Sequence, residues 1–194
     1  MQVSEAGLQM IKGSESLRTQ VYDDRNGRTI YSYEEAIGYP TIGIGHLIRS
    51  DEREYFSQYL GGRGRMTEKQ AWDLFREDIR KHTDPWTSRL TAPVTQQMLD
   101  AMISLAFNAG VNAKSLHRAI DAINLKDYQK AADEIRNGPT TSGGVTMPGL
   151  VRRRNEEADL FLSGGLPKIK VLPWLLVGSV ALLGVSLYIR SRRK

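Results

Sequence analysis

The sequence predicts an α+β fold, with a small β-hairpin lobe, a larger helical lobe and a single C-terminal transmembrane helix. Residues 18–48 are rich in Gly, Tyr, Thr and Ile, which favours short strands and turns. Residues 95–110 are apolar nearly all round, as in a helix buried among other helices. Residues 171–189 carry no charge. We therefore expect a hairpin lobe, then helices around a central buried helix, then a membrane span.

A first helix is predicted over residues 3–17. Ser4 is its expected N-cap, and Leu8, Ile11 and Leu17 form its apolar face. Glu15 falls near the C-terminal end of this helix. Without further information, a solvated residue on the helix surface is the simpler interpretation of Glu15, and a catalytic carboxyl is the alternative.

The hairpin lobe is expected to begin after this helix. Asn26-Gly27 is a strong turn signal, and Asp24 just before it is a residue type that favours turns. A turn would also fix the carboxylate in place. Thr41 opens a run in which Gly43 and Gly45 alternate with isoleucines, which indicates a strand approached closely by another backbone. His46 ends the run, as either a hydrogen-bonded structural histidine or a residue lining a cleft.

The helical lobe is predicted from residue 67 onward. Thr67 and Gln70 fit a capping box, and Asp84-Pro85 predicts the end of the helix that they start. Gly110 stands where the central helix needs a C-terminal cap, and Asn108 is the polar residue near its end, suited to capping or to ligand binding. Two more helices over 115–123 and 125–136, a Gly/Pro/Thr loop over 137–148 and a last helix ending at 163–165 complete the lobe.

Three segments in this order resemble the phage-type lysozyme (endolysin) family. The first is Glu15, then Asp24, then the run Thr41-Ile42-Gly43-Ile44-Gly45-His46. Residues 95–110 resemble the central helix of that family, and residues 148–157 resemble its Gly-Leu-x-x-Arg-Arg segment. The resemblance covers roughly residues 4–163, and it implies a lysozyme-like arrangement of the two lobes.

The resemblance also implies a catalytic site. It assigns Glu15, Asp24 and Thr41 to catalysis, with substrate-binding roles for His46, Asn108 and Arg153. An arginine of the last helix would support Glu15, with Arg153 the first choice and Arg152 the second. The simpler reading of these two arginines is a solvated basic face that pairs with Glu156 and Glu157. No metal and no organic cofactor is implied.

The chain departs from the family between Asp24 and Thr41, which lie seventeen residues apart. The additional residues, roughly 29–39, are expected to enlarge the hairpin or to form a lobe at the edge of a cleft. Tyr31 and Tyr33 in this insertion are either sugar-stacking rings or incidental surface tyrosines. Glu34 or Glu35 is an alternative to Asp24 as the second carboxylate.

The implied reaction is hydrolysis of the β-1,4 bond between N-acetylmuramic acid and N-acetylglucosamine in bacterial peptidoglycan. Paired carboxyl groups across a cleft suit acid-assisted cleavage of such a bond. A lytic transglycosylase, which would use Glu15 and form a 1,6-anhydro end, is the close alternative. A membrane-anchored wall-binding or virion structural protein that has lost activity is the alternative of another class.

The composition excludes several other classes of protein. There are no cysteines, so disulfides and cysteine-ligated metals are ruled out, and the three histidines show no zinc-type spacing. Six of the 27 basic residues lie after residue 165, where there are no acids, which leaves 21 basic against 22 acidic residues before it. The net charge of +5 therefore belongs mainly to the tail, and a nucleic-acid partner is not expected.

The tail predicts a membrane anchor, so we divide the chain into a catalytic domain over 1–165 and an anchor over 166–194. A helix over residues 171–189 would be about 28 Å long, enough to cross a hydrocarbon core. Trp174 and Tyr188 stand near its two ends, and basic residues flank both sides. The N-terminus shows no cleavable signal peptide.

The tail does not fix the orientation of the protein in the membrane. We expect a monomer in the host inner membrane or a virion membrane, with the catalytic domain acting on the periplasmic or cell-wall side. The enzyme left inside the cell, and an enzyme packaged for entry, are the other arrangements.

Overall fold

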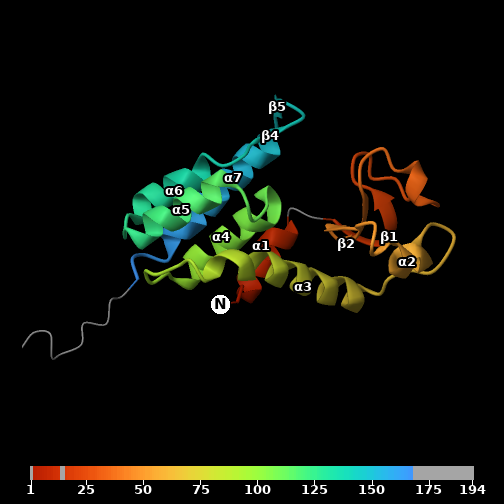
Figure 1. Ribbon diagram of the computed structural model, residues 1–194, viewed down its shortest axis with the longest axis horizontal. Coiled ribbons are helices and arrows are strands. Elements are labelled where there is room, and N and C mark those ends of the chain that lie inside the picture. Colours follow the sequence, from red (N-terminus) through yellow and green to blue (C-terminus); the bar gives the residue numbers. More distant parts are fainter. Residues whose placement is uncertain (1, 14–15, 168–194) are drawn as a thin grey trace, which may run out of the picture.

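The computed structural model describes residues 2–13 and 16–167, and it confirms an α+β fold in two lobes (Figure 1). The small lobe holds an antiparallel sheet in the order β1-β2-β3, with β1 Leu17–Asp23, β2 Pro40–Ile44 and β3 His46–Leu47. It is completed by a short helix and two 3-10 turns: α2 Arg53–Phe56, η1 Tyr33–Glu35 and η2 Ser57–Tyr59. Its own core lies under the sheet and includes Val21, Ile42 and Phe56.

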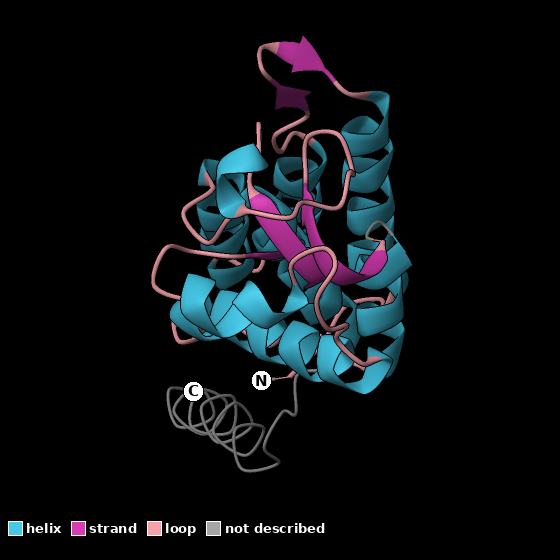
Figure 2. Cartoon of the chain, turned by 90° about the vertical axis from the view of Figure 1, so that its right-hand side faces the viewer, coloured by secondary structure: helices cyan, strands magenta, loops and turns pink. Residues whose placement is uncertain are grey.

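The larger lobe is helical, and α3 (Glu68–Thr87) joins it to the small lobe along one side of the molecule (Figure 1). Its other helices are α1 Glu5–Gly13, α4 Gln96–Ala109, α5 Lys114–Asn124, α6 Tyr128–Arg136 and α7 Pro148–Ser163. Every residue of α4 from Met98 to Ala106 is buried, because α1, α3, α5 and α7 pack around it. This confirms the predicted central helix. Figure 2, seen from the side of the small lobe, shows its sheet in front of the helices of the larger lobe.

Helix α1 is shorter than predicted. The Ser4 hydroxyl accepts the Gly7 N–H at 3.0 Å, so Ser4 is the N-cap, as expected. The helix ends at Gly13, however, and Leu17 already belongs to β1. The prediction of a helix to Leu17 is wrong because the apolar Leu17 side chain packs from the sheet against both cores. Glu15 lies outside the described residues.

The start of α1 is tied to the central helix through Asp100. Its carboxylate accepts the Ser4 N–H at 2.9 Å and the Ser4 hydroxyl at 2.5 Å. A Cβ atom at Gly7 would lie only 2.6 Å from Asp100 Cγ and 2.8 Å from a Val3 methyl carbon. Gly7 therefore permits the close approach that lets α1 dock on α4.

Replacing Gly7 by alanine is expected to destabilise the protein. The clash costs about 1–3 kcal/mol, which the better helix propensity of alanine offsets by about 1 kcal/mol. We expect the Tm to fall by several degrees in thermal unfolding. Gly13→Ala is the matched control in the same helix, since nothing lies within 4 Å of a Cβ there. An equal or higher Tm for Gly7→Ala than for Gly13→Ala would contradict the docking role.

Helix α3 begins as predicted but does not end at Pro85. Thr67 and Gln70 form the complete capping box. The helix continues through Pro85 to Thr87, so the predicted break is wrong. The buried Trp86 explains the continuation: its indole N–H donates to the His82 carbonyl at 2.7 Å, and its ring lies in the core. The missing proline N–H falls only two residues before the helix ends.

The remaining predictions on the helical lobe hold with small shifts of boundary. Gly110 caps α4 with a φ of 87°. The loop before α7 contains a two-stranded hairpin, β4 Thr141–Ser142 and β5 Val145–Thr146, which projects from the lobe (Figure 1). Within the described part of the chain, no helix has the length and apolarity that a membrane span requires. The predicted span over 171–189 lies outside that part, so it and the proposed domain boundary stay predictions.

Candidate functional site

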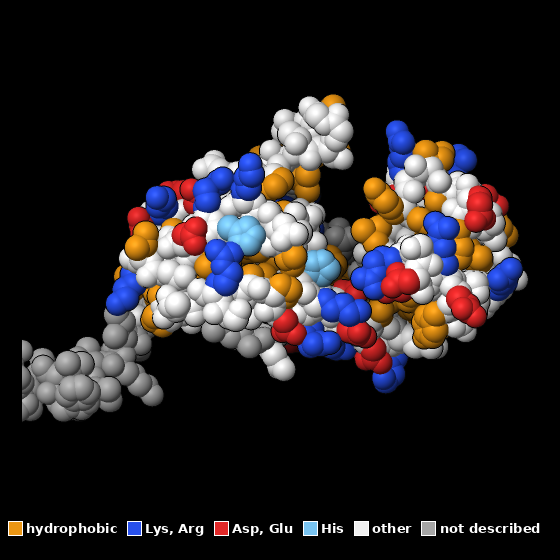
Figure 3. Space-filling view, viewed as in Figure 1, with side chains coloured by type: hydrophobic (Ala, Val, Ile, Leu, Met, Phe, Trp, Pro, Cys, Tyr) orange, Lys and Arg blue, Asp and Glu red, His pale blue; other side chains and the backbone are white. Residues whose placement is uncertain are grey.

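A cleft of about 640 Å³ lies between the two lobes. Figure 3 shows the surface hollowed at this place. Four of the predicted site residues line it: Asp24, Thr41, His46 and Asn108. The first three come from the small lobe and the fourth comes from the end of α4. The structure thus brings together groups that lie up to 84 positions apart in the chain.

Asp24 and Thr41 are held by one residue, Tyr39. The Tyr39 N–H donates to Asp24 Oδ1 at 2.6 Å, and its carbonyl accepts the Asp24 N–H at 3.1 Å. The same carbonyl accepts the Thr41 hydroxyl at 3.1 Å. Because the Thr41 proton is used in this bond, the hydroxyl oxygen is left with lone pairs to accept a hydrogen bond from water or substrate.

The buried Asp23 carboxylate holds the end of the insertion between Asp24 and Thr41 in place. This carboxylate is 1% exposed and accepts the N–H groups of Arg25, Ile37 and Gly38 at 2.9–3.1 Å, and the Asn26 amide at 2.7 Å. A Cβ at Gly38 would overlap Asp24 Oδ1. The insertion is therefore fastened against the aspartate pair, and the absence of a side chain at Gly38 leaves room for the Asp24 carboxylate.

The environment of Asp23 predicts a dependence of stability on pH. Burial alone would raise the pKa of Asp23, but the three backbone N–H donors outweigh it, so that its pKa lies below the ordinary value. A folded-state pKa below the unfolded value stabilises the fold above the unfolded pKa of about 3.9. That stability is lost as the pH falls through the folded pKa.

Asp23→Asn is expected to have a lower Tm than the wild type at pH 7. The difference should stay constant down to about pH 5 and shrink below about pH 4, as the wild-type carboxylate becomes protonated. Thermal unfolding of both proteins from pH 3 to pH 7 measures it. A difference in Tm that grows as the pH falls would contradict the role of Asp23 as an ionised anchor.

His46 is both a hydrogen-bonded structural histidine and a residue that lines the cleft, the two interpretations that the sequence left open. Its Nδ1 atom lies 2.8 Å from Asp78 Oδ2 on α3, and its Nε2 atom lies 3.5 Å from Glu52 Oε2. Because an ionised carboxylate only accepts hydrogen bonds, Nδ1 is the donor to Asp78. His46 also lines the cleft, and its ring packs against Phe56 with the ring centroids 5.1 Å apart. It therefore joins the small lobe to α3 at the base of the cleft.

Asn108 borders a second hollow as well, of about 800 Å³, between α1, α7 and the β4–β5 hairpin. The Arg154 guanidinium donates to Asn108 Oδ1 at 2.9 Å. Arginine has no acceptor, so the side-chain oxygen of Asn108 faces Arg154 and its amide N–H₂ is left for the cleft. Asn108 is thus placed to donate hydrogen bonds to an acceptor on a bound substrate.

Arg154 belongs to a buried charged network that the sequence did not single out. Arg154 and Glu157 are fully buried, with Arg154 Nη2 3.0 Å from Glu157 Oε1. Ser104 donates to the same oxygen at 2.6 Å. Burial raises the pKa of Glu157 and lowers the pKa of Arg154. The attraction between the two opposite charges acts in the other direction on both pKa values, but burial has the larger effect.

Of the two predicted arginines, Arg153 belongs to this network and Arg152 does not. Arg153 is buried, donates to Glu157 at 3.3 Å and lines the second hollow. Arg152 is exposed and pairs with Glu156 at 3.7 Å across one helix turn. The simple reading as a solvated ion-paired face therefore fits Arg152 but not Arg153. The proposed support of Glu15 by an arginine involves a residue outside the described chain.

The side chains predicted within the insertion do not reach the cleft wall. The Tyr33 hydroxyl donates to the Arg53 carbonyl at 2.8 Å, and the Tyr31 ring lies against Gly61. Glu35 accepts the Tyr31 N–H at 3.0 Å. Neither Glu35 nor Glu34 lines the cleft, which favours Asp24 over both as the second carboxylate.

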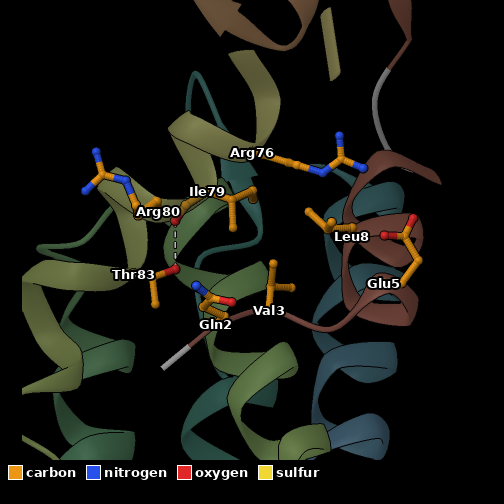
Figure 4. Close-up of a pocket in the computed structure, with 8 residues that line it drawn as sticks. All are labelled: Gln2, Val3, Glu5, Leu8, Arg76, Ile79, Arg80 and Thr83. Carbon is orange, nitrogen blue, oxygen red and sulfur yellow. Dashed lines mark hydrogen bonds between the residues drawn. The ribbon is translucent and has the colours of Figure 1, made fainter. Parts of the chain in front are cut away.

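Two other features concern ligands. Within residues 2–13 and 16–167, no three His, Asp or Glu side chains are grouped so that they could hold a metal ion. A third pocket, of about 410 Å³, lies between the start of α1 and α3 (Figure 4). Figure 4 shows Val3, Leu8 and Ile79 near its centre, with the charged ends of Glu5, Arg76 and Arg80 around it. None of the predicted site residues that the structure describes lines this pocket.

Comparison with known proteins supports the same region of the chain. The family model described as phage lysozyme matches residues 12–157. The endolysin of Bacillus phage B103 is 34% identical over 164 residues, which are 84% of this chain and 55% of that protein. The chain thus spans about half the length of that relative.

Solved structures show the same similarity. A mutant of P22 lysozyme is 30% identical with a TM-score of 0.61, covering 84% of this chain and 99% of that one. The muramidase domain of SpmX from Asticaccaulis excentricus is 25% identical with a TM-score of 0.58, covering 84% and 98%. With a family model matched over three quarters of its length, and with Asp24, Thr41, His46 and Asn108 on one cleft, the chain belongs to the phage lysozyme family.

Proposed function

We propose that this chain hydrolyses peptidoglycan at the β-1,4 bond between N-acetylmuramic acid and N-acetylglucosamine. The observation that carries the proposal is the Asp24–Tyr39–Thr41 arrangement on the wall of the interlobe cleft. A carboxylate and a hydroxyl with free lone pairs, held by one backbone unit, can hold a water molecule beside a glycosidic bond. The kinship with a muramidase domain and with phage endolysins supports the choice of substrate.

The steps divide among the predicted residues. Glu15 would protonate the oxygen of the leaving sugar, which requires a carboxyl that stays protonated near neutral pH. Asp24, ionised, would hold or activate the attacking water, or stabilise the positive charge that develops on the sugar. Thr41 would orient the water by accepting one of its protons in a hydrogen bond. Asn108 would donate to an acceptor of the bound sugar, such as an acetamido oxygen.

Purified peptidoglycan offers a direct test of this proposal. The wild type should release soluble fragments, and Glu15→Gln should reduce the rate by about 10²–10⁴-fold. A far-UV circular dichroism spectrum identical to the wild type would show that the variant is folded. A folded wild type that releases nothing would refute the enzymatic proposal and favour a wall-binding protein.

We also propose that residues 171–189 anchor the enzyme in a membrane. The support is their nineteen-residue length without charge, the flanking Trp174 and Tyr188, and the basic cluster at the C-terminus. The full chain expressed in bacteria should sediment with membranes, resist extraction by carbonate and dissolve in detergent. A chain ending at residue 165 should be recovered in the supernatant.

The orientation of the anchor follows from protease digestion. The larger basic cluster favours a cytoplasmic C-terminus, with the catalytic domain on the far side of the membrane. Protease added to spheroplasts should then digest the domain. A full chain that remains in the supernatant after sedimentation would contradict the anchor altogether.

A further inference from the structure

We propose that the side chain of Tyr39 is a saccharide-contacting residue beside the bond that is cut. The proposal rests on the proposed function, and it names a contact that determines how the glycan is held. The Tyr39 backbone is hydrogen-bonded to both Asp24 and Thr41, so the position of Tyr39 relative to these two residues is fixed. A side chain on this residue is carried at a fixed place next to the reacting groups.

The pairing of β1 with β2 places Tyr39 beside the cleft residues. Tyr22 pairs with Thr41 and Asp23 pairs with Pro40, and the Asp24 N–H continues this ladder to the Tyr39 carbonyl at 3.1 Å. Asp24 and Thr41 line the cleft, and Tyr39 is bonded to both from the position just before β2. The exposed Tyr39 ring therefore lies beside these two residues, next to the lined part of the cleft.

The ring is available to a ligand. Tyr39 is 68% exposed, although its backbone is held at both ends. Of the insertion's other tyrosines, Tyr33 donates its hydroxyl to the Arg53 carbonyl, and the Tyr31 ring, 64% exposed, lies against Gly61. In Figure 3, hydrophobic side chains gather on the edge of the small lobe that faces the hollow.

The chemistry matches a sugar ring in a glycan chain. A pyranose presents an apolar face of C–H bonds and a polar edge of hydroxyls, and a tyrosine ring presents an apolar face and one polar tip. Covering the exposed ring with such a face removes apolar surface from water at little cost in conformational entropy, because the backbone is already fixed. The contact would strengthen binding of glycan without taking part in proton transfer.

The test compares Tyr39→Ala, Tyr39→Phe and the wild type on soluble glycan strands. We expect Tyr39→Ala to raise KM about three- to tenfold with kcat within about twofold, since the backbone bonds to Asp24 and Thr41 remain. Tyr39→Phe should behave as the wild type. Tyr55→Ala is the matched control: Tyr55 is 62% exposed on α2, whereas Tyr39 is bonded to Asp24 and Thr41. An unchanged KM, or a fall confined to kcat, would overturn the proposal.

A binding measurement tests the Tyr39 contact separately from the proposed hydrolytic activity. Co-sedimentation with insoluble peptidoglycan measures affinity whether or not the bond is cut. If the wild type releases no fragments, the proposed function fails, while weaker sedimentation of Tyr39→Ala than of Tyr55→Ala still supports the glycan contact. Equal sedimentation of the two variants would refute the Tyr39 contact even in an active enzyme.

Discussion

Asp24→Asn is expected to lower kcat on peptidoglycan by about 10²–10⁴-fold and to leave the Tm nearly unchanged. Asp24 is exposed on the cleft wall, and an asparagine oxygen can still accept the Tyr39 N–H, so the local backbone survives. The change removes the negative charge that holds water or stabilises a cationic transition state. Rates on purified peptidoglycan and thermal unfolding of the same preparation measure both effects.

Asp23→Asn is the matched control one residue away. Asp23 is buried and accepts backbone N–H groups, so its replacement should lower the Tm far more than Asp24→Asn does. Replacement of Asp24 is thus expected to lower kcat with little change in Tm, whereas replacement of Asp23 is expected to lower the Tm. If Asp24→Asn keeps more than about half of the wild-type rate, Asp24 is not the second catalytic carboxylate.

Arg154→Met is expected to destabilise the protein by about 3–5 kcal/mol, because it leaves Glu157 buried without its closest cation. At roughly 2–4 °C per kcal/mol for a chain of this size, the Tm should fall by roughly 6–20 °C. The variant also frees the Asn108 amide to rotate, so the KM of the folded fraction should rise.

Arg152→Met is the control for this effect, on the same helix. Arg152 is exposed, and its pair with Glu156 is worth little, so its Tm should change by no more than about 1–2 °C. Thermal unfolding at pH 7 compares the two variants. Similar losses for both, or a stable Arg154→Met protein, would contradict the assignment of the buried network to Arg154.

Local signals in the sequence predicted much of this fold. The Thr67–Gln70 capping box, the Asn26-Gly27 turn and the largely apolar run of α4 each depend on residues close together, and each is confirmed. Long-range packing decided the failures. Pro85 stays within α3 because Trp86 is buried in the core, and α1 ends at Gly13 because Leu17 belongs to the sheet.

The candidate site likewise combines residues that the sequence predicted with contacts that depend on long-range packing. Motif order was enough to place Asp24, Thr41, His46 and Asn108 on one cleft. The buried anchor Asp23 differs from Asp24 only in how the insertion folds back on it, which a sequence pattern does not encode. In the run Arg152-Arg153-Arg154, the register of α7 against α4 alone makes the third arginine the partner of Asn108.

The products released from purified peptidoglycan test the central claim most directly. The measurement is the mass of the fragments that a chain ending at residue 165 releases, beside its Glu15→Gln variant. The proposed mechanism predicts fragments with reducing ends that carry one added water, and their loss in the variant. Fragments with 1,6-anhydro ends would contradict the hydrolytic mechanism and place the chain among the lytic transglycosylases.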